Sequence, residues 1–88
     1  MSALPQDADL SEDLKRLGER IRRLREARGW SQDTFAHLAG LNRAYPYKIE
    51  SGKVDLRYST LRKIAHVLET TVAEVVRADA ADVLPVQK

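Results

Sequence analysis

The apolar residues of this 88-residue chain recur three and four positions apart, in short runs that end at glycines. This spacing is typical of one face of an amphipathic α-helix, and no run shows the strict alternation of a half-buried strand. The longest run predicts a helix over about residues 11–28, with Ser11 as its N-cap and Gly29 just after its end. The sequence therefore predicts an all-α fold.

Four shorter helices are predicted after this one, and each follows a residue whose side chain can accept a hydrogen bond from the first turn. These predicted N-caps are Ser31, Asn42, Ser59 and Thr71. Glu74 lies three positions after Thr71, which is the pattern of a capping box. We expect residues 1–10 to form an acidic, flexible arm, residues 11–78 the folded five-helix domain, and residues 79–88 a tail.

The composition excludes several classes of protein. Apolar residues make up 43% and charged residues 32% of the chain, which is typical of a small globular domain. Cysteine is absent, so disulfides and thiolate metal sites are excluded. No apolar run approaches the ~20 residues of a membrane span, and the first residues lack a signal-peptide pattern. We expect a soluble, cytoplasmic protein with no membrane partner.

The net charge of +2 conceals a strong segregation of charge. Residues 14–63 contain thirteen basic and five acidic residues, whereas both ends of the chain are acidic. Clustered lysine and arginine favour a polyanion, because they release counterions from a phosphate backbone. The alternative is that these charges are ordinary solvated helix faces. Charge alone does not decide between the two.

No residue pattern predicts catalysis or a bound cofactor. The glycines are spread too widely to form a phosphate-binding loop. His66 and Glu69 could share a helix face, but His37 is distant in sequence and no third ligand accompanies the pair. No serine, aspartate or lysine lies in a recognisable catalytic arrangement. We expect neither a metal, nor a cofactor, nor an enzyme.

The most informative stretch is residues 31–52. Ala36 is small where a second helix must cross closely, and Gly40 permits a sharp turn between two short helices. Leu41 and Ile49 can hold the second of these helices on the core. These are the requirements of a helix-turn-helix, in which one helix supports another that enters the major groove.

In these features the sequence resembles the phage-repressor and Cro family of helix-turn-helix regulators, also called Xre-type. The resemblance runs from about Leu17 to Val76. Its landmarks are the segment 23–29, Ser31-Gln32, Ala36, Ala39-Gly40-Leu41, Arg43, Tyr45, Ile49-Glu50-x-Gly52-Lys53 and Thr60-Leu61. It implies a compact, lambda-repressor-like five-helix bundle, closest to small controller-type and antitoxin-type members.

The resemblance also implies roles for individual residues. Those expected at base edges open the recognition helix or lie one turn further on: Asn42, Arg43, Ala44, Tyr47 and Lys48. Those expected at phosphates are Gln32, Tyr45, Ser51, Lys53 and Arg57. Three assignments stay open at this point. Asn42 serves as a helix cap or an adenine reader, the Tyr47 hydroxyl can serve a phosphate instead, and Tyr45 packs on the core or reaches a phosphate.

Three further residues have a structural rather than a DNA-binding interpretation. The family resemblance implies that Arg25 and Glu50 form an ion pair that braces the first helix against the recognition helix. Pro46 departs from the family, which usually has isoleucine or valine at this inward position. Because proline lacks an N–H and its ring crowds the preceding turn, the recognition helix is expected to begin later, near Tyr45, or to have a distorted first turn.

The family usually forms two-fold dimers that read palindromic double-stranded DNA. We expect a homodimeric repressor whose interface includes Val72, Val75 and Val76, with help from Val83 and Leu84. The alternative for the valines is closure of the chain's own core, and we expect them to serve both the core and the interface. Two alternative functions stay open: an antitoxin that holds a toxin through residues 1–13 or 79–88, and a protein-interaction module.

Overall fold

The computed structural model describes residues 7–77 and confirms an all-α fold of five helices. The helices are α1 (Asp7–Ala27), α2 (Gln32–Ala39), α3 (Tyr45–Glu50), α4 (Tyr58–Val67) and α5 (Val72–Val76). Within this part of the chain, no helix is long and apolar enough to cross a membrane. The predicted tail and the first six residues of the predicted arm lie outside the described residues.

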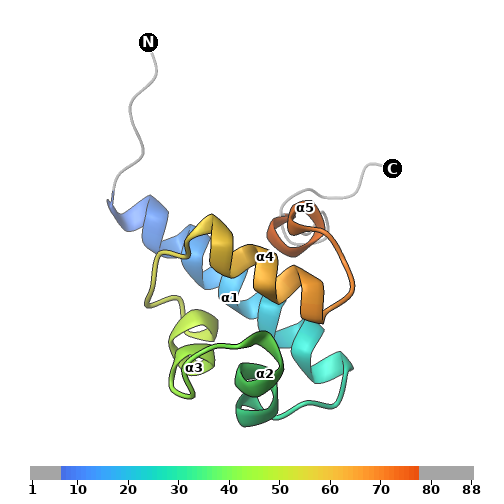
Figure 1. The fold of residues 1–88 in the computed structure, drawn as a ribbon. Helices are drawn as coiled ribbons and strands as arrows, with labels where there is room; N and C mark the ends of the chain where they lie inside the picture. Colours follow the sequence, from blue (N-terminus) through green and yellow to red (C-terminus); the bar gives the residue numbers. More distant parts are fainter. Residues whose placement is uncertain (1–6, 78–88) are drawn as a thin grey trace.

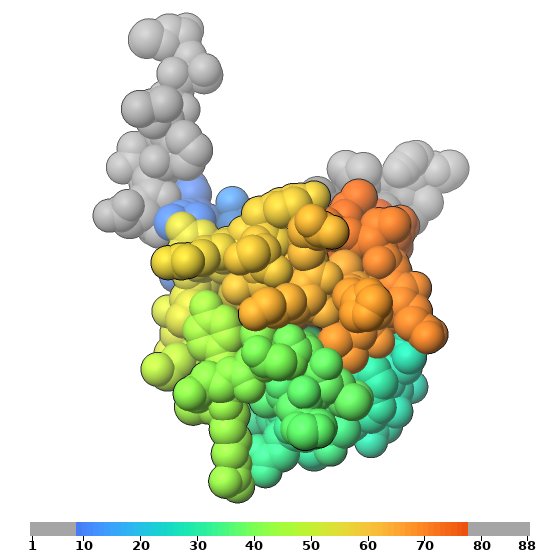
Figure 2. Space-filling model, in the orientation of Figure 1, coloured from blue at the N-terminus to red at the C-terminus, as the bar shows by residue number. Residues whose placement is uncertain are grey.

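The long helix α1 runs along the molecule behind the other helices in the view of Figure 1. Both α3 and α5 pack directly on α1, while α4 packs on α5 and α2, and α2 packs on α3. The pair α2 and α3, with the turn between them, therefore forms one end of the molecule, with α4 above it (Figure 2). Helix α1 supports this pair through α3, and α4 supports it through α2.

One hydrophobic core joins all five helices. Ile21 of α1, Phe35 of α2, Ile64 of α4 and Val75 of α5 are fully buried, and Ile49 of α3 is nearly so. Burying each such side chain contributes about 1.5–3 kcal/mol relative to leaving it exposed. The ring of Trp30, in the connection after α1, stacks on Phe35 with centroids 6.4 Å apart. The core thus lies between α1 and the other four helices.

Several predicted helix boundaries are confirmed. The Ser31 hydroxyl accepts a hydrogen bond from the Thr34 amide at 3.0 Å, and the Thr71 hydroxyl accepts one from the Glu74 amide at 3.1 Å. Gly40 ends α2 with a left-handed φ of 68°, which lets the Leu41 amide donate back to the Ala36 carbonyl at 2.8 Å. The corner between α2 and α3 is therefore built as expected.

Other boundaries differ from the prediction. Helix α1 begins at Asp7 rather than after Ser11, so residues 7–10, assigned to the arm, are helical. Acidic residues suit the first turn of a helix, where the dipole is positive. The predicted cap Ser59 lies inside α4, whose N-cap is Arg57 and lacks a side-chain hydrogen bond. Helix α3 begins at Tyr45, three positions after Asn42.

Sequence patterns did not reveal the close contact between α1 and α3 at Gly18. A Cβ at this position would lie 2.7 Å from the Glu50 carbonyl oxygen and closer still to that of Ile49. The last turn of α3 thus rests directly on the backbone of α1. A glycine in the middle of a helix costs about 0.5–1 kcal/mol relative to alanine, and here it permits this contact.

We expect Gly18→Ala to lower the free energy of unfolding by about 1–3 kcal/mol, because the added methyl group pushes α3 away from α1. Thermal and urea unfolding measure this loss. Ser11→Ala is the control, since Ser11 is exposed on the same helix and its change to alanine should leave stability nearly unaltered. A Gly18→Ala protein as stable as the wild type would contradict the proposed tight packing.

Candidate nucleic-acid interface

Helix α3 presents one face to solvent and buries the other. Ala44, Tyr47 and Lys48 are exposed, whereas Pro46 and Ile49 are buried. These exposures follow the helical period, because residues three and four apart share a face. Asn42 and Arg43, in the turn before α3, are also exposed. All five residues expected at base edges are therefore accessible from outside the molecule.

The turn before α3 is held by Asn42. Its side-chain oxygen accepts a hydrogen bond from the Ala44 amide at 2.9 Å, and its carbonyl accepts one from the Tyr45 amide at 2.9 Å. This is an Asx turn, in which a side chain imitates a backbone acceptor. Two roles were open for Asn42, a helix cap and an adenine reader. In the structure its side-chain oxygen acts as a cap, but it caps the turn rather than the helix.

The late start of α3 explains how the chain accommodates Pro46. With Ala44 as N-cap, Pro46 is the second helical residue, where a backbone N–H has no acceptor within the helix. Of the two predicted outcomes, the structure thus shows the shortened helix. The Pro46 ring is fully buried, so it replaces an aliphatic side chain in the core.

An ion pair fixes the other end of α3. The Arg25 guanidinium donates to Glu50 through Nε at 2.7 Å and through Nη2 at 3.0 Å. Arg25 Nη1 donates to the Trp30 carbonyl at 2.6 Å, and Gln32 Nε2 donates to Glu50 Oε1 at 3.0 Å. The network joins α1, the connection after it, the first residue of α2 and the last residue of α3 (Figure 1).

This network is shielded from water. The Arg25 and Glu50 side chains are only 10% and 3% exposed. The hydrogen bonds to Glu50 raise the pKa of Arg25 above its ordinary value, so the guanidinium stays charged under any ordinary condition. The side-chain amide of Gln32, expected at a phosphate, is turned toward Glu50 instead. Its remaining route to a phosphate is the backbone amide at the start of α2.

The basic middle of the sequence divides into two kinds of cation. On α1, every lysine and arginine has a carboxylate within 4.0 Å: Lys15, Arg16, Arg20, Arg22, Arg23 and Arg25. Beyond α2, Arg43 pairs with Asp33 at 3.2 Å, but five other exposed cations of this basic stretch have no acidic partner among the described residues: Lys48, Lys53, Arg57, Arg62 and Lys63. The unpaired positive charge therefore follows α3, the loop after it, and α4.

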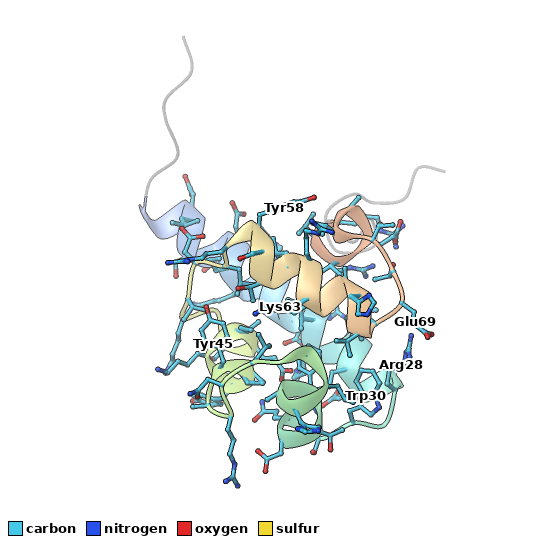
Figure 3. The ribbon with its side chains drawn as sticks, viewed as in Figure 1. Arg28, Trp30, Tyr45, Tyr58, Lys63 and Glu69 are labelled. Carbon is cyan, nitrogen blue, oxygen red and sulfur yellow. The ribbon has the colours of Figure 1, made fainter. Side chains whose placement is uncertain are left out.

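Other expected phosphate contacts have varied surroundings. Tyr45 is half-buried and its ring packs against the core, the first of its two open roles (Figure 3). The Ser51 hydroxyl donates to the Tyr47 carbonyl at 2.7 Å, so its proton is used within α3. Lys53 places its Nζ 5.5 Å from the centre of the exposed Tyr47 ring. Arg57 is exposed at the N-cap of α4.

The valines of α5 do not share one environment. Val75 is fully buried in the chain's own core, so it has no surface for a partner and its assignment to an interface is wrong. Val72 is half-buried against the core, while Val76 is 44% exposed. Val83 and Leu84 lie outside the described residues.

Two arginines at the end of α1 and beyond it have roles that sequence reasoning missed. Arg20 Nε donates to the Glu74 carbonyl at 2.8 Å, which ties α5 to α1. Arg28 donates to the Leu68 carbonyl at 2.6 Å and lies 3.4 Å from Glu69 (Figure 3). Both donate to carbonyl oxygens near helix ends, which basic side chains commonly satisfy. The arginine-rich segment therefore serves the fold rather than a ligand.

Asp33 is a further residue missed by the sequence analysis. It lies in the first turn of α2, and its Oδ1 accepts a hydrogen bond from Arg43 Nε at 3.2 Å. Both side chains are largely exposed. The signal that could have found it is its acidic charge, the only one between Glu26 and Glu50 in an otherwise basic stretch.

The structure and sequence resemble those of DNA-binding regulators. The model of a helix-turn-helix domain family matches residues 16–78. The restriction-modification controller protein C.AhdI from Aeromonas hydrophila is 37% identical, with a TM-score of 0.72, over 76% of this chain and 97% of its own. A hypothetical transcription factor, NHTF, from Neisseria is 25% identical, with a TM-score of 0.74, over 93% and 91% of the two chains.

A third solved structure is similar over a part of its length. An HTH_3 family transcriptional regulator from Vibrio cholerae is 28% identical, with a TM-score of 0.71, over 84% of this chain and 39% of its own. None of the curated proteins matches the chain. The structures that match are named as regulators, and none of the three titles names an enzyme.

We expect Glu50→Gln to lower the free energy of unfolding by about 3–5 kcal/mol, because it leaves the buried charge of Arg25 without a counterion. Glu26→Gln is a matched control, since Glu26 lies 3.8 Å from the same guanidinium but is 54% exposed. That change should cost less than about 1 kcal/mol. Equal losses in chemical unfolding would show that burial of the pair is unimportant.

Proposed function

This chain belongs to the helix-turn-helix domain family of DNA-binding transcription regulators, and on that premise we propose that it is a dimeric, sequence-specific repressor. In this proposal it reads a palindromic operator in double-stranded DNA, with α3 of each subunit in the major groove. The exposed face of α3, flanked by cations without acidic partners, carries the proposal. Occupying a promoter is the simplest way for such a domain to repress.

The proposed base contacts come from the turn and from the outward face of α3. Lys48 and Arg43 supply donors for guanine, whose O6 and N7 both accept in the major groove. Ala44 offers a methyl group to thymine or lets the helix approach closely. Tyr47 reaches a base edge or a phosphate through its hydroxyl. Asn42 sets the turn and contributes to readout through its side-chain amino group.

The proposed phosphate contacts surround these residues. Lys53 and Arg57 provide unpaired charge on the loop after α3. Gln32 contributes its backbone amide at the start of α2, where the helix dipole favours an anion. Tyr45 and Ser51 contribute weakly, because the first packs on the core and the second donates its proton within α3. Phosphate contacts of this kind fix the register of the helix on the duplex.

The domain organisation is part of the same proposal. Residues 11–77, together with residues 7–10 in the first turn of α1, form the DNA-binding unit. The six residues of α3 span roughly 9 Å, so one subunit contacts only a few base pairs. A two-fold dimer doubles the site, and Val76 with the exposed edge of Val72 is the apolar surface on α5 from which to build it.

Of the two alternative functions, neither is favoured by a specific contact. A distorted recognition helix would favour a protein-interaction module, but proline at the second helical position leaves the outward face of α3 intact. An antitoxin would need a toxin-binding segment within residues 1–13 or 79–88. The 37% identity to a restriction-modification controller supports the regulator instead.

DNA binding is tested by selecting bound fragments from random duplexes and then titrating the enriched duplex. If each subunit neutralises about five phosphates, the logarithm of the affinity should fall with the logarithm of salt concentration by about 4–5 per subunit. Fluorescence anisotropy over a range of salt concentrations measures this slope. Failure to enrich any sequence, with the fold intact, would contradict the proposal and favour the protein-interaction module.

Within that assay, Lys48→Ala is expected to weaken binding to the enriched duplex by about 10-fold or more, the cost of one good base contact. Arg16→Ala is a matched control. It also removes one positive charge, but Arg16 lies on α1 with Asp13 at 3.6 Å. Equal effects of the two changes would indicate that only net charge matters.

The dimer is tested separately by sedimentation at micromolar concentration. We expect Val76→Asp to raise the dimer dissociation constant by at least about 10-fold, because it places a charge in an apolar interface. Leu38→Asp is a control, since Leu38 is similarly exposed, at 48%, but lies on α2. A wild-type protein that sediments only as a monomer would refute this interface.

A further inference from the structure

An acidic side chain lies beside the residues proposed to contact DNA. Asp33 is 63% exposed in the first turn of α2, and its Oδ1 accepts from Arg43 Nε at 3.2 Å. A carboxylate in this place repels the phosphate backbone, so it weakens binding to every sequence. Its contact with Arg43 must therefore serve a purpose other than affinity for DNA.

Stability is not that benefit. The Arg43 side chain is 83% exposed, and ion pairs so open to water contribute only about 0–1 kcal/mol to folding. The pair joins the first turn of α2 to the turn before α3, but Gly40 and the Asn42 hydrogen bonds already hold that connection. Removing Asp33 should leave the fold unchanged.

The geometry of the pair shows what Asp33 can do. Only Nε of the guanidinium contacts Asp33, and neither Nη1 nor Nη2 has another hydrogen-bond partner in the described part of the chain. Two parallel N–H groups therefore remain for a pair of acceptors, the arrangement that matches O6 and N7 of guanine. Asp33 thus holds one edge of the Arg43 guanidinium, and the other edge is available to a base.

No other polar contact restrains Arg43 in the part of the chain that the structure describes. It borders an open hollow of about 340 Å³, together with Asp33, Ala36, His37 and Leu41. A long side chain with this much space has several rotamers, and ordering it on a base costs side-chain entropy. Asp33 is its only polar partner within residues 7–77, so the carboxylate selects among these rotamers before DNA arrives.

We infer that Asp33 is a positioning residue, which orients Arg43 for bidentate recognition of a guanine and thereby increases selectivity at the cost of general affinity. The inference rests on the proposed DNA-binding function and names one determinant of its specificity. When DNA displaces water from the pair, the attraction between Asp33 and Arg43 strengthens, because the surrounding dielectric falls.

The test measures base preference rather than binding alone. Relative affinities are measured for the enriched duplex and for duplexes with each base pair replaced in turn. Arg43→Ala identifies the position that Arg43 reads, where we expect its preference to fall by about 10-fold or more. Asp33→Ala should lower the preference at that same position by about 3- to 10-fold and leave the other positions unchanged.

Three further variants separate positioning from charge. Asp55→Ala removes another exposed acid, in the loop after α3, and should raise affinity for all sequences without changing any preference. Asp33→Asn keeps an acceptor oxygen and should retain most of the preference that Asp33→Ala loses. The double variant Asp33→Ala/Arg43→Ala should discriminate no worse than Arg43→Ala alone, because the two residues act together. Melting temperatures of all variants should equal the wild-type value.

The inference is overturned if Asp33→Ala keeps the wild-type preference, if Asp33→Asn loses as much as Asp33→Ala, or if the losses in the double variant add. These outcomes differ from failure of the proposed function. In that case the wild-type protein enriches no sequence at all, and both proposals fall together. If the wild-type protein selects a DNA sequence but Asp33→Ala has no effect on base preference, only the role of Asp33 is refuted.

Discussion

The buried pair of Arg25 and Glu50 is the interaction on which the position of α3 depends. A six-residue helix is too short to be stable alone, so its orientation must come from its neighbours. Glu50 is the last residue of α3, and its carboxylate accepts from α1 and from the start of α2. Gly18 brings the same end of α3 onto the α1 backbone. The C-terminal end of α3 is thus fixed by two contacts, the ion pair with Arg25 and the close approach to α1 at Gly18.

This arrangement also explains which cations are available for a polyanion. The arginines of α1 and Arg28 are occupied by carboxylates or by carbonyls at helix ends, so the most arginine-rich segment of the sequence serves the fold. The available charge lies on α3, the following loop and α4, where fewer bases occur. Local ion pairing, rather than the count of bases, determines the location of a binding surface.

The sequence predicted the elements that depend on local chemistry. Capping by Ser31 and Thr71, the turn at Gly40 and the apolar periodicity of the core all follow from neighbouring residues, and all are present. Apart from the Arg25–Glu50 pair, which the family resemblance implied, it did not predict features that depend on distant partners. Whether Val75 faces the core, whether Gly18 meets another backbone, and whether Asp33 meets Arg43 are decided by helix packing, which no local pattern records.

The candidate site, too, has a part that the sequence located and a part that depends on contacts it did not reveal. Family resemblance located α3 and its exposed residues, but Pro46 moves the first helical residue to Tyr45, which leaves Asn42 and Arg43 in a turn. A turn lacks the regular hydrogen bonds that orient side chains on a helix. Its geometry must therefore come from specific contacts, and the Asx turn at Asn42 and the carboxylate of Asp33 supply them. In the proposed function, selectivity consequently depends on residues of α2 and of the turn as much as on the short helix itself.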